Sequence, residues 1–157
     1  MNTEPVKTLH YRKSRFVTHL PIDYRYTPSH YWAAPSDGGV WRVGFTKFAT
    51  RMLGDMVDHG VDAAPGTKVS TGDVLGWIEG FKALSDLYAV GEGELIGSNP
   101  ALKERVELVS KRPYDDGWIY QFKGELDERA MDVHAYAQLL DVTIQRILDK
   151  EQAENEE

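Results

Sequence analysis

The chain has 157 residues, which is enough for one compact domain with a few peripheral elements. Its 41% hydrophobic and 27% charged residues are an ordinary globular mix, and its net charge of −7 disfavours nonspecific binding to nucleic acid or to an acidic membrane surface. It has no cysteine, which excludes disulfides, thiolate nucleophiles and cysteine-ligated clusters, so any sulfur chemistry must arrive on a cofactor.

Residues 1–14 are polar and basic, with Lys7, Arg12 and Lys13 among them. They lack the apolar run of a secretory signal, and no later stretch has the length of a membrane span, so we expect a soluble cytoplasmic protein without membrane contacts. Because the chain as a whole is acidic, a flexible solvated arm is a better interpretation of this segment than a nucleic-acid-binding arm.

From residue 16 to residue 122 the chain alternates short apolar stretches with Gly, Pro, Asn and Asp. The stretches are 16–20, 40–45, 74–78, 87–90, 94–96 and 118–122. Closely spaced short strands with turn residues between them predict a mainly β domain, a small sandwich or barrel. One short internal helix is expected at 47–53, with Thr46 as N-cap and Gly54 at its end, and a second helical turn after Asn99-Pro100.

The period changes near the C-terminus. Apolar residues recur there at three- and four-residue steps, namely Val133, Tyr136, Ala137, Leu140, Ile144, Ile147 and Leu148. With Asp132 as N-cap, this stripe predicts a helix over about 133–151. We expect the stripe to pack on the β domain, the alternative being a dimer seam. Residues 15–150 thus form a single domain, and the acidic tail 152–157 should fray because negative charge opposes the helix dipole at a C-terminus.

The segment from Lys68 to Asn99 carries the chemistry. A strand at 74–78 and a return strand at 84–90 enclose Glu79-Gly80-Phe81-Lys82-Ala83, so Lys82 is expected near the tip of a hairpin, with 91–93 as the next turn. Such a lysine projects into solvent from a rigid base, which suits a residue that another enzyme acylates. Taken alone, however, it is better interpreted as an ordinary exposed lysine in a polar turn.

The whole segment nevertheless resembles the H-protein family of the glycine cleavage system. The matching blocks fall in that family's order and spacing over roughly residues 24–140, and they are Tyr26-Thr27-Pro28-Ser29-His30, Val43-Gly44-Phe45-Thr46, Leu53-Gly54-Asp55, Glu79-Gly80-Phe81-Lys82-Ala83-Leu84-Ser85-Asp86, Gly93-Glu94, Asn99-Pro100, Pro113-Tyr114-Asp115-Asp116-Gly117-Trp118 and Asp132 to Tyr136. A lone Lys-Ala pair would be weak, whereas this ordered series is specific.

The resemblance implies a barrel-sandwich hybrid fold with lipoate in amide linkage to Lys82. It implies recognition of the hairpin by a lipoate ligase or lipoyl transferase, with Glu79 and Gly80 as contacts and Asp86 as a further site residue. Biotin carriers have a related fold but usually flank their lysine with methionines. Lys82 is flanked by Phe81 and Ala83, so we do not expect a biotin carrier. The five histidines have no metal-ligand spacing, so no metal site is expected.

A lipoyl arm makes the chain a carrier and not an enzyme. Its cyclic disulfide can be opened and reclosed by thiol–disulfide exchange, a chemistry that this cysteine-free chain cannot supply from its own side chains. The partners perform the catalysis: the enzymes that load and unload the arm, and dihydrolipoamide dehydrogenase, which reoxidises it.

The cargo is the open point. In glycine cleavage the arm holds a methylamine, whose ammonium needs a carboxylate in a cleft, and the family supplies one from a His-Glu-Trp motif and one from an Asp four residues after the lysine. Asp86 is present, but this sequence has Tyr31 between His30 and Trp32. Ser29, His30 and Tyr31 are therefore expected to form a cargo cleft weakened for an ammonium.

The segments 56–62 and 89–93 also depart from the family pattern. Together with Phe81 and the run 50–54, they resemble the H-protein-like lipoate-binding proteins of bacterial sulfur oxidation, which carry sulfur for a heterodisulfide-reductase-like complex. The sequence interpretation leans to that subfamily, with glycine cleavage as the alternative. A second alternative, a non-lipoylated adaptor, is disfavoured by the intact Glu79, Lys82 and Asp86.

Overall fold

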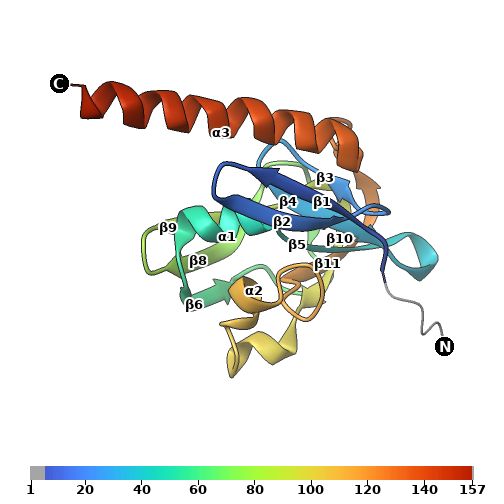
Figure 1. Ribbon diagram of the computed structural model, residues 1–157. Helices are drawn as coiled ribbons and strands as arrows, with labels where there is room; N and C mark the ends of the chain where they lie inside the picture. Colours follow the sequence, from blue (N-terminus) through green and yellow to red (C-terminus); the bar gives the residue numbers. More distant parts are fainter. Residues whose placement is uncertain (1–5, 157) are drawn as a thin grey trace.

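The computed structural model describes residues 6–156. Its elements in chain order are β1 (Thr8–Lys13), β2 (Phe16–Pro21), β3 (Arg25–Tyr26), β4 (Tyr31–Pro35), η1 (Asp37–Gly39), β5 (Val40–Phe45), α1 (Lys47–Leu53), β6 (Met56–Val61), β7 (Lys68–Val69), β8 (Val74–Gly80), β9 (Leu84–Tyr88), β10 (Gly91–Ser98), η2 (Pro100–Lys103), α2 (Leu108–Lys111), β11 (Tyr120–Leu126) and α3 (Val133–Asn155). Figure 1 shows the β domain with α3 lying across one side of it.

Two sheets enclose the main core. One has six strands in the order β3-β4-β5-β11-β10-β7, and the other has three in the order β6-β8-β9. Their inward residues form one apolar cluster, in which Val43, Ile78, Leu87, Leu95 and Phe122 are at most 1% exposed. Alternation along each strand explains this core, because successive side chains point to opposite faces of a sheet. The expected mainly β domain with one short internal helix and a C-terminal helix is confirmed.

The short internal helix α1 has the expected ends. The Thr46 side chain accepts a hydrogen bond from the Ala49 amide, and Gly54 follows the last turn with a φ of 82°. The turn after Asn99 also forms, as η2 with the Asn99 side chain as its cap. The expected turn at 91–93 is wrong, since these residues begin β10.

The expected flexible arm 1–14 is wrong where the structure describes it. Residues 8–13 form β1, which pairs with β2 in an antiparallel hairpin, while residues 1–5 lie outside the described part of the chain. Tyr11 on β1 and Phe16 and Leu20 on β2 are buried, so the hairpin has one apolar face. In the sequence this alternation is hard to detect, because basic residues stand between the apolar ones and a strand of six residues gives only a weak periodic signal.

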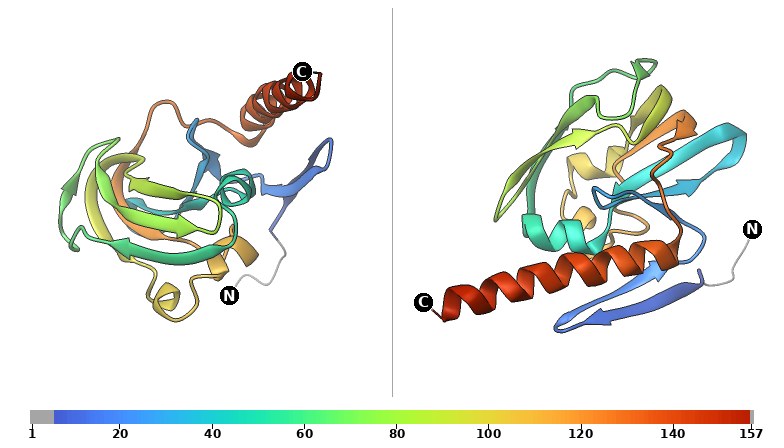
Figure 2. Two further views of the ribbon diagram at one scale, coloured as in Figure 1. Left: turned by 90° about the vertical axis from the view of Figure 1, so that its left-hand side faces the viewer. Right: turned by 90° about the horizontal axis from the view of Figure 1, so that it is seen from above.

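The hairpin and α3 form a second core against the β domain. In both views of Figure 2 the hairpin lies beside α3, and the Tyr11 hydroxyl donates a hydrogen bond to Asp141 at 2.7 Å. Tyr136, Leu140 and Ile144 of α3 are buried there with Trp32 of β4. The apolar stripe therefore packs on the protein's own β domain, as expected, and does not form a dimer seam.

The helix continues through the acidic tail that was expected to fray, as far as Asn155, and Glu157 lies outside the described residues. Glu, Gln and Ala are strong helix formers, and the Gln152 amide reaches Glu156 one turn further on at 3.4 Å. These preferences outweigh the unfavourable dipole interaction, which is worth only about 0.3–1 kcal/mol at an exposed site. Among the described residues no helix has the length and apolar character needed to cross a membrane.

Candidate functional site

Lys82 lies at the tip of the β8–β9 hairpin. The Gly80 amide donates to the Ala83 carbonyl at 2.8 Å, which closes a tight turn with Phe81 and Lys82 at its centre. Phe81 is 84% exposed, and Lys82 is exposed beside it. The lysine is therefore accessible to another protein, as the sequence predicts.

The tip is attached to the junction between α1 and β6. The Lys82 amide donates to the Leu53 carbonyl at 2.8 Å, and the Phe81 amide donates to the Asp55 carbonyl at 2.8 Å. The backbone under the lysine thus has hydrogen-bond partners outside its own hairpin. An exposed turn held in this way presents its side chain from a fixed base.

Two glycines permit this close approach. A Cβ on Gly54 would lie 2.9 Å from the Lys82 amide nitrogen, and its φ of 82° also favours glycine. A Cβ on Gly80 would collide with the Leu53 carbonyl oxygen. Gly80 is buried, so its part is to let the hairpin approach α1. Of the two enzyme contacts expected from the sequence, Glu79 is exposed and Gly80 is not.

Glu79 and Asp86 lie on the outer face of the β6-β8-β9 sheet. Glu79 is opposite Leu84 and Trp77 is opposite Asp86, and all four positions share one face because side chains alternate. Both carboxylates are exposed. Glu79 remains available to a partner. Asp86 does not line the cleft formed by Ser29, His30 and Tyr31, but its carboxylate lies 3.5 Å from the hydroxyl of Tyr88, which does.

That cleft has a volume of about 220 Å³. Ser29, His30 and Tyr31 line it together, as predicted, with Ser85 and Tyr88 from β9 and with apolar side chains from β5 and α1. None of its lining residues carries a carboxylate. Tyr31 is only 2% exposed, and its hydroxyl accepts a hydrogen bond from the Tyr88 amide at 2.9 Å. Burial raises the pKa of Tyr31, so this side chain stays neutral.

His30 is also uncharged near neutral pH. Burial lowers the pKa of His30 to about 4, because a desolvated imidazole binds its proton poorly. Its Nδ1 is joined by a 2.8 Å hydrogen bond to the hydroxyl of Tyr136, which is also hydrogen-bonded to Thr46 at 2.8 Å. His30 has a φ of 71°, so this network holds it in a left-handed conformation. The side chains that line the cleft are therefore uncharged, and the Asp86 carboxylate lies outside the lining, 3.5 Å from the Tyr88 hydroxyl.

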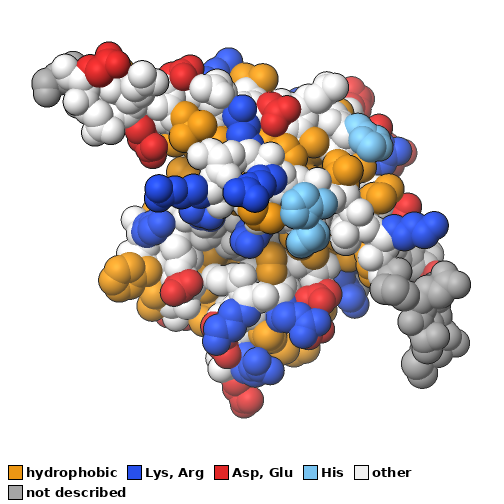
Figure 3. Space-filling model, in the orientation of Figure 1, with side chains coloured by type: hydrophobic (Ala, Val, Ile, Leu, Met, Phe, Trp, Pro, Cys, Tyr) orange, Lys and Arg blue, Asp and Glu red, His pale blue; other side chains and the backbone are white. Residues whose placement is uncertain are grey.

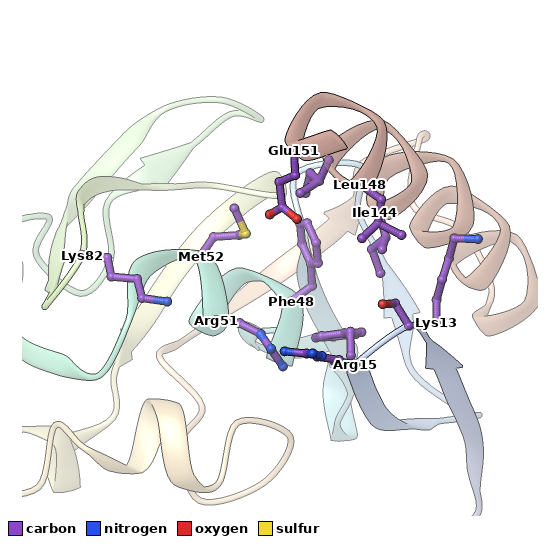
Figure 4. Close-up of a pocket in the computed structure, with 12 residues that line it drawn as sticks. Lys13, Arg15, Phe48, Arg51, Met52, Lys82, Ile144, Leu148 and Glu151 are labelled. Carbon is purple, nitrogen blue, oxygen red and sulfur yellow. The ribbon is translucent and has the colours of Figure 1, made fainter. Parts of the chain in front are cut away.

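A larger groove opens beside the lysine, with a volume of about 490 Å³. It lies between the tip of the β1–β2 hairpin, α1 and the last turns of α3, and Lys82 is on its rim (Figure 4). The lining residues are Lys13, Ser14, Arg15, Phe16, Phe48, Arg51, Met52, Lys82, Ile144, Ile147, Leu148 and Glu151. We call it the basic groove, because Lys and Arg side chains gather below α3 on the face shown in Figure 3.

Sequence reasoning missed this groove and its arginines. The run 50–54 was interpreted only as a mark of a subfamily, yet Arg51 and Met52 of α1 line the groove. The signal available in the sequence was the position of these two residues on the expected short helix 47–53, directly before the Leu53-Gly54-Asp55 block. Within residues 6–156 no three His, Asp or Glu side chains are arranged to hold a metal ion.

An exposed lysine on a fixed hairpin tip, in a domain of two facing β-sheets, is the arrangement that a swinging-arm carrier requires. The family model described as glycine cleavage H-protein matches residues 24–143. The chain is 38% identical over 128 residues to the glycine cleavage system H protein of Enterobacter sp. (strain 638), which is 80% of this chain and 98% of that protein. It is 37% identical over 128 residues to that of Salmonella arizonae, with the same coverage.

Among solved structures, the glycine cleavage system H protein from Mycobacterium marinum superposes with a TM-score of 0.68 at 31% identity, covering 76% of this chain and 97% of that chain. The chain belongs to the glycine cleavage H-protein family, and the expected barrel-sandwich fold is confirmed. Proteins of this family are carriers with lipoate covalently attached to a lysine. Lys82 fits that group, because its side chain and that of Phe81 beside it are exposed on a turn held by backbone hydrogen bonds.

Proposed function

We propose that Lys82 is the lipoyl attachment site and that the chain carries a thiol-bound intermediate between partner enzymes. The observation that supports this most strongly is the turn itself, in which an exposed lysine stands on backbone held by Leu53 and Asp55. Acylation removes the lysine's charge, and the attached group supplies a reversible disulfide to a chain without cysteine.

The surroundings of Lys82 suit recognition by other proteins. Phe81 is 84% exposed and Leu84 is 69% exposed on either side of the lysine, and Met52 is 50% exposed on α1. Exposed apolar side chains of this size mark interaction surfaces when they cluster. We propose that a lipoate ligase or lipoyl transferase binds here, with Glu79 as a polar contact, and that dihydrolipoamide dehydrogenase and the other partners reach the arm from this side.

The attachment site is tested by mass. We expect the intact mass of the wild type, coexpressed with a lipoylating enzyme, to show one lipoyl adduct, and that of Lys82→Arg to show none. Lys68→Arg, on β7, is the control and should be modified like wild type. An adduct that persists on Lys82→Arg would show that the arm is attached elsewhere, and an unmodified wild type would favour the adaptor alternative.

For the cargo, the first candidate is the aminomethyl group of glycine cleavage. The relatives reported above are named for that system, so the comparisons favour this candidate over the sulfur pathway to which the sequence interpretation leaned. The partners would then be the glycine cleavage enzymes.

The second candidate is a sulfur cargo delivered to a heterodisulfide-reductase-like complex. One observation favours it: the cleft of Ser29, His30 and Tyr31 contains no carboxylate, and burial keeps its tyrosine and histidine neutral. A desolvated ammonium without a charged partner is unfavourable by several kcal/mol. A sulfur bound to a thiol brings no such charge.

The two cargos are separated by their retention. The lipoylated chain is loaded by incubation with glycine and a glycine decarboxylase, and mass spectrometry follows the lifetime of the aminomethyl adduct. The control is the Enterobacter H protein reported above, loaded in the same way. Equal lifetimes would support glycine cleavage. A charge-assisted hydrogen bond is worth about 1.5–3 kcal/mol, so a lifetime shorter by about tenfold or more would support the sulfur candidate.

A further inference from the structure

Two segments that build the basic groove lie outside the residues matched by the family model. That match covers 24–143, whereas the hairpin tip contributes Lys13 to Phe16 and α3 contributes Ile144 to Glu151. Only α1 and the lysine hairpin come from the matched part. The groove is thus made by this chain's additions to the family domain, placed against the residue that carries the arm.

The groove is strongly basic in an acidic protein. Lys13, Arg15 and Arg51 line it, and within the described part of the chain none of the three forms an ion pair. Figure 4 shows Arg15 from the hairpin and Arg51 from α1 extending toward the same part of the groove. Glu151 is the single acidic lining residue and comes from the opposite wall. Unpaired cations in a concave site favour an anionic ligand.

The rest of the groove is apolar. Phe16 and Phe48 are buried at its floor, and the Arg51 guanidinium lies 5.8 Å from the centre of the Phe16 ring. Ile147 and Leu148 of α3 form the wall above them. The volume of about 490 Å³ is within the range of about 300–1,000 Å³ that small-molecule sites have. The shape and chemistry suit an aliphatic chain that ends in an anion.

We propose that the basic groove binds the dihydrolipoyl arm of Lys82 and that Arg15 and Arg51 hold its terminal sulfur as the thiolate. Lys82 is itself a lining residue, so the attached chain begins in the groove. This inference rests on the proposed lipoylation of Lys82 but applies to either cargo, because both are accepted and released at a thiol. The thiol's proton goes to solvent, and the two guanidiniums stabilise the negative sulfur that remains.

The absence of cysteine makes the test specific. In the lipoylated, reduced protein, iodoacetamide reacts with no protein thiol other than those of the arm, so the rate of alkylation against pH, read by intact mass, reports the thiol pKa. The groove variant is Arg15→Gln with Arg51→Gln. The control is Arg25→Gln with Lys103→Gln, which removes the same charge from exposed positions outside the groove.

We expect the groove variant to raise the thiol pKa by about one unit, as the loss of nearby opposite charge does. Below the pKa, a rise of about one unit lowers the thiolate fraction about tenfold. The more basic thiolate is about three times more nucleophilic, so alkylation should slow about threefold overall. The control should follow wild type, and the difference should shrink at high salt. Equal pH profiles for the wild type and the groove variant would overturn the inference. A wild type without a lipoyl adduct would instead contradict the proposed function.

Discussion

At the scale of single residues, Gly80 decides how Lys82 is presented. Its backbone lies so close to the Leu53 carbonyl that any Cβ would collide with it. We expect Gly80→Ala to displace the turn from α1, to lower the free energy of unfolding by about 1–3 kcal/mol and to slow lipoylation.

The control for this prediction is Gly72→Ala. Gly72 has a φ of 93° and open space around a built Cβ, in a turn at the start of β8, so this change brings backbone strain without a collision at Lys82. Both variants should lose stability in thermal melts, but Gly72→Ala should be lipoylated at the wild-type rate. Equal lipoylation rates for the two variants would show that the close approach has no part in recognition.

His30 makes stability depend on pH. Burial lowers the pKa of His30 to about 4, below the value of about 6.5 in an unfolded chain, so the unfolded state binds the proton first. The stability that neutral His30 contributes is fully present above about pH 6.5 and is lost as the pH falls toward about 4. The free energy of unfolding decreases by about 2–3 kcal/mol over this range. His30→Asn keeps a polar atom near Tyr136 and tolerates the left-handed backbone, but does not titrate.

Urea unfolding of both proteins from pH 7.5 to 4 measures this contribution. Carboxylates titrate in both proteins, so a difference between their slopes of unfolding free energy against pH is due to the histidine. We expect the wild type to lose more stability than His30→Asn over this range. Parallel curves would mean that the folded protein accommodates a charged imidazole at this position.

At the scale of elements, α3 stabilises the fold through its apolar stripe. Leu140 is fully buried between the β1–β2 hairpin and the β domain, whereas Val142 on the same helix is 51% exposed. Leu140→Ala should lower the free energy of unfolding by about 2–5 kcal/mol, and Val142→Ala should change it by less than about 0.5 kcal/mol. Circular dichroism melts of the two variants compare these effects, and similar melting temperatures would contradict the packing of α3.

At the scale of the whole molecule, charge is divided between faces. The chain has a net charge of −7, yet Arg15 and Arg51 extend toward each other in the groove that Lys82 borders (Figure 4). They come from segments far apart in the sequence, the β1–β2 hairpin and α1, which meet where the Phe16 and Phe48 rings pack edge to face with their centres 5.9 Å apart. Net charge therefore says little about the site of this protein, since the local arrangement opposes it.

The sequence by itself determined the features that depend on neighbouring residues. The caps of α1 at Thr46 and Gly54, the period of α3 and the exposed position of Lys82 in its turn all follow from local preferences and short spacings. The resemblance of ordered motifs added the family. These signals are local, so they are visible in one chain without its fold.

Only the tertiary structure decided what depends on distant contacts. It turned residues 8–13 from an expected arm into a strand, because their apolar face has α3 to pack against. It placed Asp86 outside the lining of the cleft of Tyr31, although the hydroxyl of Tyr88, which does line that cleft, reaches the Asp86 carboxylate at 3.5 Å. It also assembled the basic groove from the β1–β2 hairpin, α1, the lysine hairpin and α3. Long-range packing brings such residues together, and no spacing in the sequence records it.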